Sequence, residues 1–248
     1  MDYQAEKITP YGSGESKTEQ VREMFDSIAP AYDFMNRAMT FGIDRIWRRK
    51  AIAMLRNCPA NDLLDIATGT GDLALLADRM LHPRQITGID LSENMLASAR
   101  RKAEAAGAGG RIRFAKGDCL ALDFPDNSFD IATVAYGVRN FEHIEKGYAE
   151  LHRVLRPGGM LCVIELSTPT NPIARFFYKL YTRTLVPLAG RLVSKDTRAY
   201  SYLPESIAAV PQGNAMLDIM RRAGFEDCRC RRFSFGACSV YIAEKRRQ

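Results

Sequence analysis

The sequence lacks the signals that would place the protein in a membrane, outside the cell or around a metal ion. No apolar run approaches the roughly 18 residues that a membrane-spanning helix needs, and no secretory signal is apparent. Only three histidines are present, and none of the six cysteines forms a CxxC pair or a Cys/His cluster with metal-ligand spacing. We therefore expect a cytoplasmic protein with reduced thiols and no metal site.

The charge balance is only mildly basic. Thirty-five Lys and Arg residues stand against 29 Asp and Glu residues, which gives a formal net charge of +6. This excess favours an anionic surface or ligand, but no basic stripe with a nucleic-acid motif accompanies it, so we expect no nucleic-acid partner. At 248 residues the chain is long enough for one α/β domain with a full core and appended helices.

The most informative stretch is LLDIATGTGD, from Leu63 to Asp72. Its apolar start predicts a short buried strand, and Gly69 and Gly71 predict a tight turn that lets a ligand approach the backbone. The residues that follow repeat apolar side chains with helical spacing. A strand, a glycine turn and a helix in this order are typical of a nucleotide-binding site.

Two nucleotide chemistries share this pattern, because residues 69–74 also fit the relaxed dinucleotide motif GxGxxG/A. Asp65 lies within the predicted strand and Asp72 at the predicted helix start, where a pyrophosphate would need bare N–H groups. The two carboxylates favour a cationic ligand such as S-adenosylmethionine, which carries a sulfonium and an ammonium group. The Asp-x-x-x-Gly-x-Gly spacing resembles the first motif of class I methyltransferases. A packed turn that binds nothing is the simplest alternative.

Two further carboxylates are expected at the same edge of the sheet. Asp90 ends a second predicted strand about twenty residues after the glycine turn, where a ribose diol is bound in such folds. Asp118 follows a third predicted strand, residues 111–116. Ligands of open parallel sheets bind outside the carboxyl ends of the strands, so Asp65, Asp90 and Asp118 are predicted to converge on one crevice.

The remaining apolar segments of the sequence predict the other strands and helices of the fold. Fourth and fifth strands are predicted at 129–135 and 160–166, helices at 93–106 and 142–155, and two last strands near 227–235 and 239–245. We predict an α/β, class I methyltransferase (Rossmann-like) fold: a seven-stranded, mostly parallel sheet with helices on both faces and a C-terminal β-hairpin. A dehydrogenase would continue with more parallel units.

The predicted domain organisation is simple. Residues 1–15 are polar and without periodicity, which predicts a flexible N-terminal arm, and residues 16–248 form one methyltransferase domain. Residues 16–58 carry helices that precede the first strand and form either a lid over the site or a packed helical layer. Residues 172–212 are predicted to be a helical insertion that covers the substrate.

The sequence also resembles one particular family, the ubiquinone/menaquinone biosynthesis C-methyltransferases, along nearly all of its length after the arm. The segments that carry the resemblance are VREMFDSIAPAYD at 21–33, DIATGTGD at 65–72, YGVRN at 136–140, LRPGG at 155–159 and YLPESI at 202–207. The glycine turn and the Pro-Gly-Gly turn occur in many methyltransferases, whereas the Gly-x-Arg-Asn element and the last segment are more particular to this family.

The resemblance implies methylation of a ring carbon of a polyprenyl benzoquinol or naphthoquinol with S-adenosylmethionine as cofactor. It implies cofactor contacts at Thr70, Asp90, Asp118, Cys119 and Ala135. Many members carry a serine where this chain has Ala135, so a side-chain hydrogen bond is lost there. Members that serve only menaquinone often vary at this serine, which favours demethylmenaquinol over the ubiquinone precursor.

Methylation of a ring carbon needs a deprotonated quinol, held in line with the S–CH3 bond in a dry site. Arg139 is predicted to stabilise the oxyanion, with Asn140 orienting it; a structural Arg139 that pairs with Asp33 or Glu142 is the alternative. Candidates for the general base are Tyr32, Asp33, His143 and a bound water.

Residues 173–188 are predicted to be an amphipathic cover for the prenyl tail. Apolar side chains recur there at helical spacing, and the basic residues Arg175, Lys179 and Arg183 recur every four residues on another face. This pattern favours transient contact with an anionic membrane surface at its cytoplasmic face; a plain surface helix is the alternative.

Three other functions share parts of these features. They are methylation of another small molecule, catalysis with NAD, and binding of S-adenosylmethionine without turnover.

Overall fold

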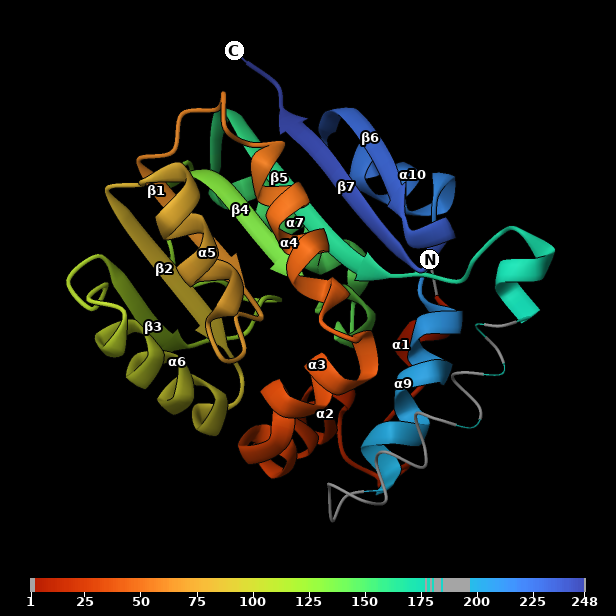
Figure 1. Cartoon of the computed structure of the whole chain (residues 1–248). Helices are drawn as coiled ribbons and strands as arrows, with labels where there is room; N and C mark the ends of the chain where they lie inside the picture. Colours follow the sequence, from red (N-terminus) through yellow and green to blue (C-terminus); the bar gives the residue numbers. More distant parts are fainter. Residues whose placement is uncertain (1–2, 177, 179, 181–183, 185–196, 248) are drawn as a thin grey trace.

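The computed structural model describes residues 3–176, 178, 180, 184 and 197–247. Its centre is a seven-stranded sheet with the order β3-β2-β1-β4-β5-β7-β6 (Figure 1). The strands are β1 (Asp62–Ile66), β2 (Gln85–Asp90), β3 (Ile112–Lys116), β4 (Phe129–Ala135), β5 (Leu155–Leu166), β6 (Phe225–Phe233) and β7 (Cys238–Lys245). β7 runs antiparallel to its neighbours β5 and β6, whereas β1 to β5 are parallel. This confirms the predicted fold class.

Helices cover both faces of the sheet, which explains why the central strands are apolar on both sides. One core lies between the sheet and the helices α4 (Ile43–Ala53), α5 (Asp72–Leu81) and α6 (Glu93–Ala105). The other lies beneath α7 (Ile144–Val154) and α10 (Asn214–Arg222). Ile131 and Ala132 of β4 are fully buried, one in each core.

The sequence pattern predicts most element boundaries closely, because apolar periodicity marks them. β2 and β4 have the predicted ends, and α5 begins at Asp72 directly after the glycine turn. β5 is longer than expected: residues 156–159, predicted to be a turn, and Leu155, predicted to end a helix, belong to the strand, and Leu155 pairs with Phe129 before a register shift in the ladder. The longer strand lies beside β7, whose partnership the local pattern does not show.

The N-terminal residues differ from the loose arm that we expect over 1–15. A short helix, α1 (Gln4–Lys7), buries Ala5 almost completely. The Tyr3 hydroxyl donates to Glu145 Oε1 at 2.6 Å, and Glu6 Oε1 accepts the N–H of Ile144 at 2.7 Å. Lys17 Nζ donates to the Ala5 carbonyl at 2.6 Å. Ile144 and Glu145 lie more than 130 residues away at the start of α7, so no local pattern could reveal these two contacts.

The helices before β1 divide into two groups. α2 (Lys17–Ile28), the 3-10 turn η1 (Ala29–Ala31) and α3 (Tyr32–Thr40) lie at the carboxyl ends of the parallel strands, beside α1 and α9 (Thr197–Ala209) (Figure 1). α4 instead packs on the sheet, where Trp47 and Ile52 are buried. Trp47 Nε1 donates to Ser234 Oγ at 2.9 Å in the 3-10 turn η3 (Ser234–Gly236).

The predicted insertion at 172–212 is described only in part. Of its apolar residues, Ile173, Phe176 and Leu180 are exposed. Phe177, Lys179 and Arg183 lie outside the described residues, so the predicted basic face is not tested by the structure. In the portion of the chain that the structure describes, no helix has both the length and the apolar character needed to cross a membrane.

Candidate active site

Two adjoining cavities open at the carboxyl edge of the parallel strands. The sheet order reverses between β1 and β4, and ligands of open α/β sheets bind at such a switch point. The first cavity, the rim cavity, lies there and is lined by the segments after β1, β2, β3 and β4 together with α2. The second, the apolar cavity, lies between α3, α4, η2 (Val138–Asn140), α9 and η3.

The glycine turn places its two glycines in different surroundings. Both have positive φ, 55° for Gly69 and 78° for Gly71, which L side chains rarely adopt. A Cβ on Gly69 would meet only Tyr32 Cε1 at 4.0 Å, so this position is open toward the rim cavity. A Cβ on Gly71 would lie 3.0 Å from Ala99 Cβ and Phe114 Cζ. Gly71 therefore serves helix packing and does not line the cavity.

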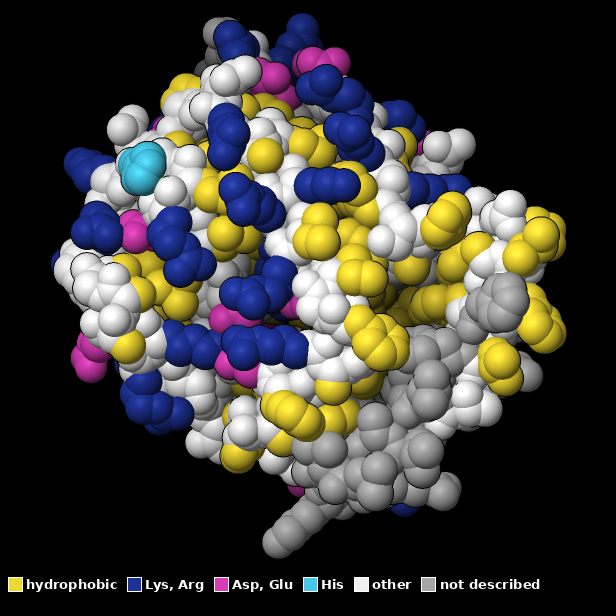
Figure 2. All heavy atoms as spheres, in the orientation of Figure 1, with side chains coloured by type: hydrophobic (Ala, Val, Ile, Leu, Met, Phe, Trp, Pro, Cys, Tyr) yellow, Lys and Arg dark blue, Asp and Glu magenta, His cyan; other side chains and the backbone are white. Residues whose placement is uncertain are grey.

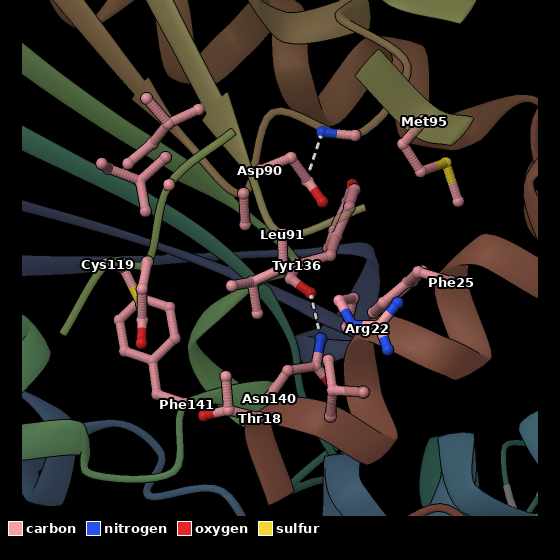
Figure 3. A pocket seen from close by; sticks show the side chains of 18 of the residues that line it. Thr18, Arg22, Phe25, Asp90, Leu91, Met95, Cys119, Tyr136, Asn140 and Phe141 are labelled. Atoms are coloured by element: carbon pink, nitrogen blue, oxygen red, sulfur yellow. Dashed lines mark hydrogen bonds between the residues drawn. The ribbon is translucent and has the colours of Figure 1, made fainter. Parts of the chain in front are cut away.

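Asp90 ends β2 at the centre of the rim cavity, as predicted (Figure 3). Its carboxylate accepts the N–H of Gly69 at 2.8 Å and that of Ser92 at 2.9 Å, so it also holds the glycine turn. Burial raises the pKa of Asp90 to about 6, although these main-chain donors act in the opposite direction. A ligand that supplies further donors would favour the ionised form.

The other predicted positions that line the rim cavity come from two segments, the turn after β3 and the end of β4, which converge as the sequence predicts. Asp118, Cys119 and Ala135 all line the rim cavity. Asp118 Oδ1 accepts the Leu120 N–H at 2.9 Å, which fixes the turn after β3. Burial raises the pKa of the Cys119 thiol well above its usual range, so this side chain is a neutral wall. Figure 3 shows Cys119 on one side of the cavity and Phe25 of α2 on the other.

Besides Gly71, two predicted cofactor residues, Asp65 and Thr70, do not line the rim cavity. Asp65 is buried behind it and accepts the hydroxyls of Thr68 and Thr133, each at 2.6 Å. The next residue, Ile66, lines the cavity, and side chains alternate along a strand, so Asp65 has to point away. Burial raises the pKa of Asp65 to about 6. Asp65 ties the glycine turn to β4.

Thr70, which the resemblance implies as a cofactor contact, is likewise turned away from the rim cavity. Its hydroxyl donates to Asp33 Oδ1 at 2.6 Å and accepts from Lys102 Nζ at 2.9 Å. Lys102 also forms ion pairs with Asp33 and with Asp72, the latter at 2.7 Å. This cluster anchors α3 to the glycine turn, so Asp33 is occupied in a structural contact.

Tyr32 and Tyr136 line both cavities and so form the wall between them. Tyr32 is the first residue of α3, and Tyr136 follows β4. Both residues therefore lie where the two cavities meet.

The apolar cavity has a volume of about 320 Å³, within the range of about 300–1,000 Å³ that is typical of small-molecule sites. Most of its walls are apolar side chains, among them Met39, Trp47, Leu203 and Ile207. Two arginines, Arg48 and Arg139, interrupt this lining. A ligand with a large apolar surface and a few oxygens matches such walls.

Arg139 lines the apolar cavity but pairs with a residue that we do not predict. Its Nη1 lies 2.7 Å from Glu165 Oε1, and Glu165 Oε2 accepts the Arg139 N–H at 3.2 Å. The alternative pairing with Asp33 or Glu142 is therefore wrong. Ala135 and Ile164 are paired in the β4–β5 ladder, which brings the next residues of both strands together.

Asn140 and His143 have different surroundings, although both follow β4. Asn140 lines the rim cavity, and its Oδ1 accepts the Tyr202 hydroxyl of α9 at 3.1 Å. Tyr202 belongs to the YLPESI segment, whose role in the site could have been suspected only from the resemblance. His143 is exposed before α7 and lines neither cavity. The structure therefore does not bring His143 to the site.

The residues of the rim cavity fit S-adenosylmethionine. A carboxylate at the end of β2 suits a ribose diol, and an open glycine position allows close approach of the ligand to the main chain. Strand order and site together define a class I S-adenosylmethionine-dependent methyltransferase. A solved SAM-dependent methyltransferase of Thermotoga maritima has a similar fold, with a TM-score of 0.64 and 20% identity over 90% of this chain and 99% of that one.

The chain belongs to the ubiE/COQ5 methyltransferase family, which it matches over residues 13–245. It is 47% identical over 245 residues to demethylmenaquinone methyltransferase of Bacteroides fragilis, covering 99% of this chain and 100% of the relative. It is 40% identical to ubiquinone/menaquinone biosynthesis C-methyltransferase UbiE of Geobacter sulfurreducens, covering 99% and 95%. The predicted family and cofactor are confirmed, and the protein is a methyltransferase and not an NAD-dependent enzyme.

Proposed function

We propose that the protein methylates a ring carbon of demethylmenaquinol with S-adenosylmethionine. The observation that carries this proposal is the pair of adjoining cavities that share Tyr32 and Tyr136. One cavity presents a carboxylate and an open glycine turn, and the other is apolar with two arginines. The relatives named demethylmenaquinone methyltransferase and UbiE support a quinone acceptor.

Within the rim cavity, Asp90 is proposed to accept the ribose hydroxyls of the cofactor. Gly69 gives the cofactor access to the main chain, and Asp118, Cys119 and Ala135 form the remaining walls. When bound, the sulfonium supplies an electrophilic methyl group. Because the chain has Ala135 where many family members have a serine, we favour the menaquinone branch over the ubiquinone branch.

Within the apolar cavity, Arg139 is proposed to stabilise the quinol oxyanion. Arg139 is 6% exposed, and its Nε atom has no hydrogen-bond partner among the described residues. Glu165 holds the Nη1 edge in place, which leaves the Nε edge for the acceptor. A preorganised donor of this kind in a dry site lowers the free energy of the phenolate, which is the reactive form for attack on the methyl group.

The proton of the quinol has to go to a base, and the structure narrows the candidates. His143 lines neither cavity, and Asp33 is held by Thr70 and Lys102. Tyr32 lines both cavities, so we propose that a water oriented by the Tyr32 hydroxyl receives the proton, either directly or through that hydroxyl, which passes its own proton on as it accepts one. Asn140, fixed by Tyr202, is proposed to orient the acceptor.

The helical segment before β1 is proposed to act as a lid through α2 and α3. The rim cavity has a volume of only about 60 Å³, far below the ~300–1,000 Å³ of typical small-molecule sites. Arg22 and Phe25 of α2 line it from the side opposite the sheet. Cofactor entry therefore requires α2 to move outward.

The mouth of the apolar cavity is proposed to rest on an anionic membrane that holds the prenyl tail. In the described part of the chain, all exposed large apolar side chains belong to the α3–α4 corner, to η3 or to residues 173–180: Phe34, Phe41, Ile43, Ile46, Ile173, Phe176, Leu180 and Phe235. Figure 2 shows hydrophobic side chains gathered on this side, with Lys and Arg beside them. Arg37, Arg45 and Arg49 are exposed on the same two helices. Apolar and basic side chains together favour an anionic bilayer.

The proposed function is tested by turnover. The protein is incubated with labelled S-adenosylmethionine and either short-tailed demethylmenaquinol or the ubiquinone precursor, and the label is located by mass spectrometry. Label on the ring carbon of demethylmenaquinol is expected. Label on oxygen, or no label on any quinol, would contradict the proposal.

A further inference from the structure

Three buried polar side-chain atoms have no hydrogen-bond partner among the described residues. They are Arg48 Nε, Tyr136 Oη and Arg139 Nε, and all three belong to residues that line the apolar cavity. Folded proteins keep few buried donors unpaired because each one is costly. Three at one cavity indicate that a bound ligand completes them.

Arg48 and Tyr136 form a pair that the proposed role of Arg139 does not use. Their side chains are buried, and the Arg48 guanidinium carbon lies 5.3 Å from the centroid of the Tyr136 ring. Asp44 fixes the guanidinium, since Arg48 Nη1 donates to Asp44 Oδ2 at 2.8 Å. Asp44 is itself held by the Thr40 hydroxyl at 2.8 Å. As with Arg139 and Glu165, one edge of the arginine is paired and Nε is left over.

The main chain at Tyr136 is strained, which gives independent support for a ligand-binding role. Its φ of 58° is left-handed, a conformation that bulky residues rarely adopt outside functional sites. The Tyr136 N–H donates to the Ile164 carbonyl at 2.7 Å, and its carbonyl accepts from Arg139 Nη1. These bonds hold the phenol in the wall between the two cavities.

We propose that Arg48 Nε and Tyr136 Oη bind the second ring oxygen of the acceptor, while Arg139 binds the first. This inference rests on the proposed function, because a quinol ring carries two oxygens. An arginine N–H donates and a phenol either donates or accepts, so the pair suits a hydroxyl oxygen. Holding both oxygens prevents rotation of the ring in its plane, and so determines which ring carbon faces the rim cavity.

The test compares a short-tailed quinol with the two matching phenols that each lack one ring hydroxyl. The wild-type protein is expected to prefer the quinol over the better phenol by roughly tenfold or more in kcat/KM, because a site built for a hydroxyl rejects its absence. In Tyr136→Phe this preference should shrink to about threefold or less. Arg48→Lys, which keeps a charge opposite Asp44 but lacks Nε, should also reduce it.

Tyr148→Phe is the matched control. Tyr148 is a fully buried residue of α7, lines neither cavity, and donates to Met216 Sδ at 3.0 Å. This variant should keep the wild-type preference and melt at a lower temperature. Tyr136→Phe should melt at or above the wild-type temperature, since it removes an unpaired buried hydroxyl. If Tyr136→Phe loses selectivity without melting lower, whereas Tyr148→Phe melts lower without losing selectivity, the Tyr136 hydroxyl binds the ligand and does not serve the fold.

Two results would overturn the inference while leaving the proposed function intact. In the first, the wild-type protein methylates the quinol, but Tyr136→Phe prefers the quinol over the phenol as strongly as the wild type does. The other is a loss of S-adenosylmethionine affinity in Tyr136→Phe that equals its loss of turnover, because the hydroxyl would then serve the cofactor. A wild type that methylates no quinol would overturn both proposals.

Discussion

The rim cavity and the apolar cavity are built in different ways. The rim cavity is lined mainly by residues at, or directly after, the carboxyl ends of β1, β2, β3 and β4, so a repeated β/α pattern produces most of it. The apolar cavity is formed by side chains from α3, α4, η2, α9 and η3, which are scattered over more than 200 residues. The rim cavity has features that class I methyltransferases share, whereas the apolar cavity is the proposed site of the acceptor. Variants in the two cavities should therefore separate cofactor binding from acceptor turnover.

The largest expected effect is that of Arg139→Met. We expect kcat to fall by about 10²- to 10³-fold, because one preorganised donor to an oxyanion contributes this much. The dissociation constant of S-adenosylmethionine should stay within about twofold, since Arg139 does not line the rim cavity. Steady-state kinetics and calorimetry measure the two quantities.

Arg139→Met also removes the cation that pairs with Glu165, which is 2% exposed. The control has to separate this loss of stability from a loss of catalysis. An unpaired buried charge destabilises a protein by about 3–5 kcal/mol. The double variant Arg139→Met, Glu165→Gln should recover thermal stability without recovering kcat. If activity returned with stability, Arg139 would be a structural residue only.

The next effect in size is that of Asp90→Ala on the rim cavity. The dissociation constant of S-adenosylmethionine should rise roughly tenfold to a hundredfold, because charge-assisted hydrogen bonds to the ribose contribute about 1.5–3 kcal/mol. The KM for the quinol should change little. An unaltered dissociation constant, measured by calorimetry, would remove Asp90 from the cofactor site.

The pH dependence of cofactor binding follows from the same carboxylate. Burial raises the pKa of Asp90 to about 6 in the free protein, and the ionised form is the one that accepts two hydroxyls. Affinity should therefore be constant above pH 7 and fall as the pH drops through 6, by up to about tenfold per unit. Asp90→Asn should show a flat profile over pH 5–7. An equally steep profile in that variant would assign the titration to another group.

The sequence predicts the residues of the rim cavity better than those of the apolar cavity, and the reason is physical. The ends of parallel strands meet at one edge, so Asp90, Asp118 and Ala135 converge once the strands are recognised. Recognising a strand does not by itself show which of its side chains face the cavity. Asp65 points away from the rim cavity because its neighbour Ile66 faces it. The partner of Arg139 depends on which strands are neighbours, and the sequence pattern does not specify that β4 lies beside β5.

A moderate effect is expected at the mouth of the apolar cavity. Replacing Arg37, Arg45 and Arg49 by glutamine should reduce binding to anionic vesicles at least about tenfold, since each basic side chain near the surface contributes about 1 kcal/mol. The matched control replaces Arg79, Arg101 and Arg113, which are exposed on α5, α6 and β3. Flotation measures both. Equal losses in the two triple variants would mean that only net charge matters and that no specific face docks.

The smallest expected effect is that of His143→Ala, which tests the boundary of both cavities. His143 precedes α7, is exposed, and its side chain makes no capping hydrogen bond with the helix. Its loss should change kcat and both binding constants by less than about twofold and unfolding by less than about 0.5 kcal/mol, as for other surface substitutions. The pH profile of kcat with the quinol is the sharper measurement, because removal of a catalytic base changes that profile, whereas removal of a surface side chain does not. An unchanged profile leaves the water at Tyr32 as the proton acceptor, whereas a changed profile would require the start of α7 to move toward the apolar cavity during turnover.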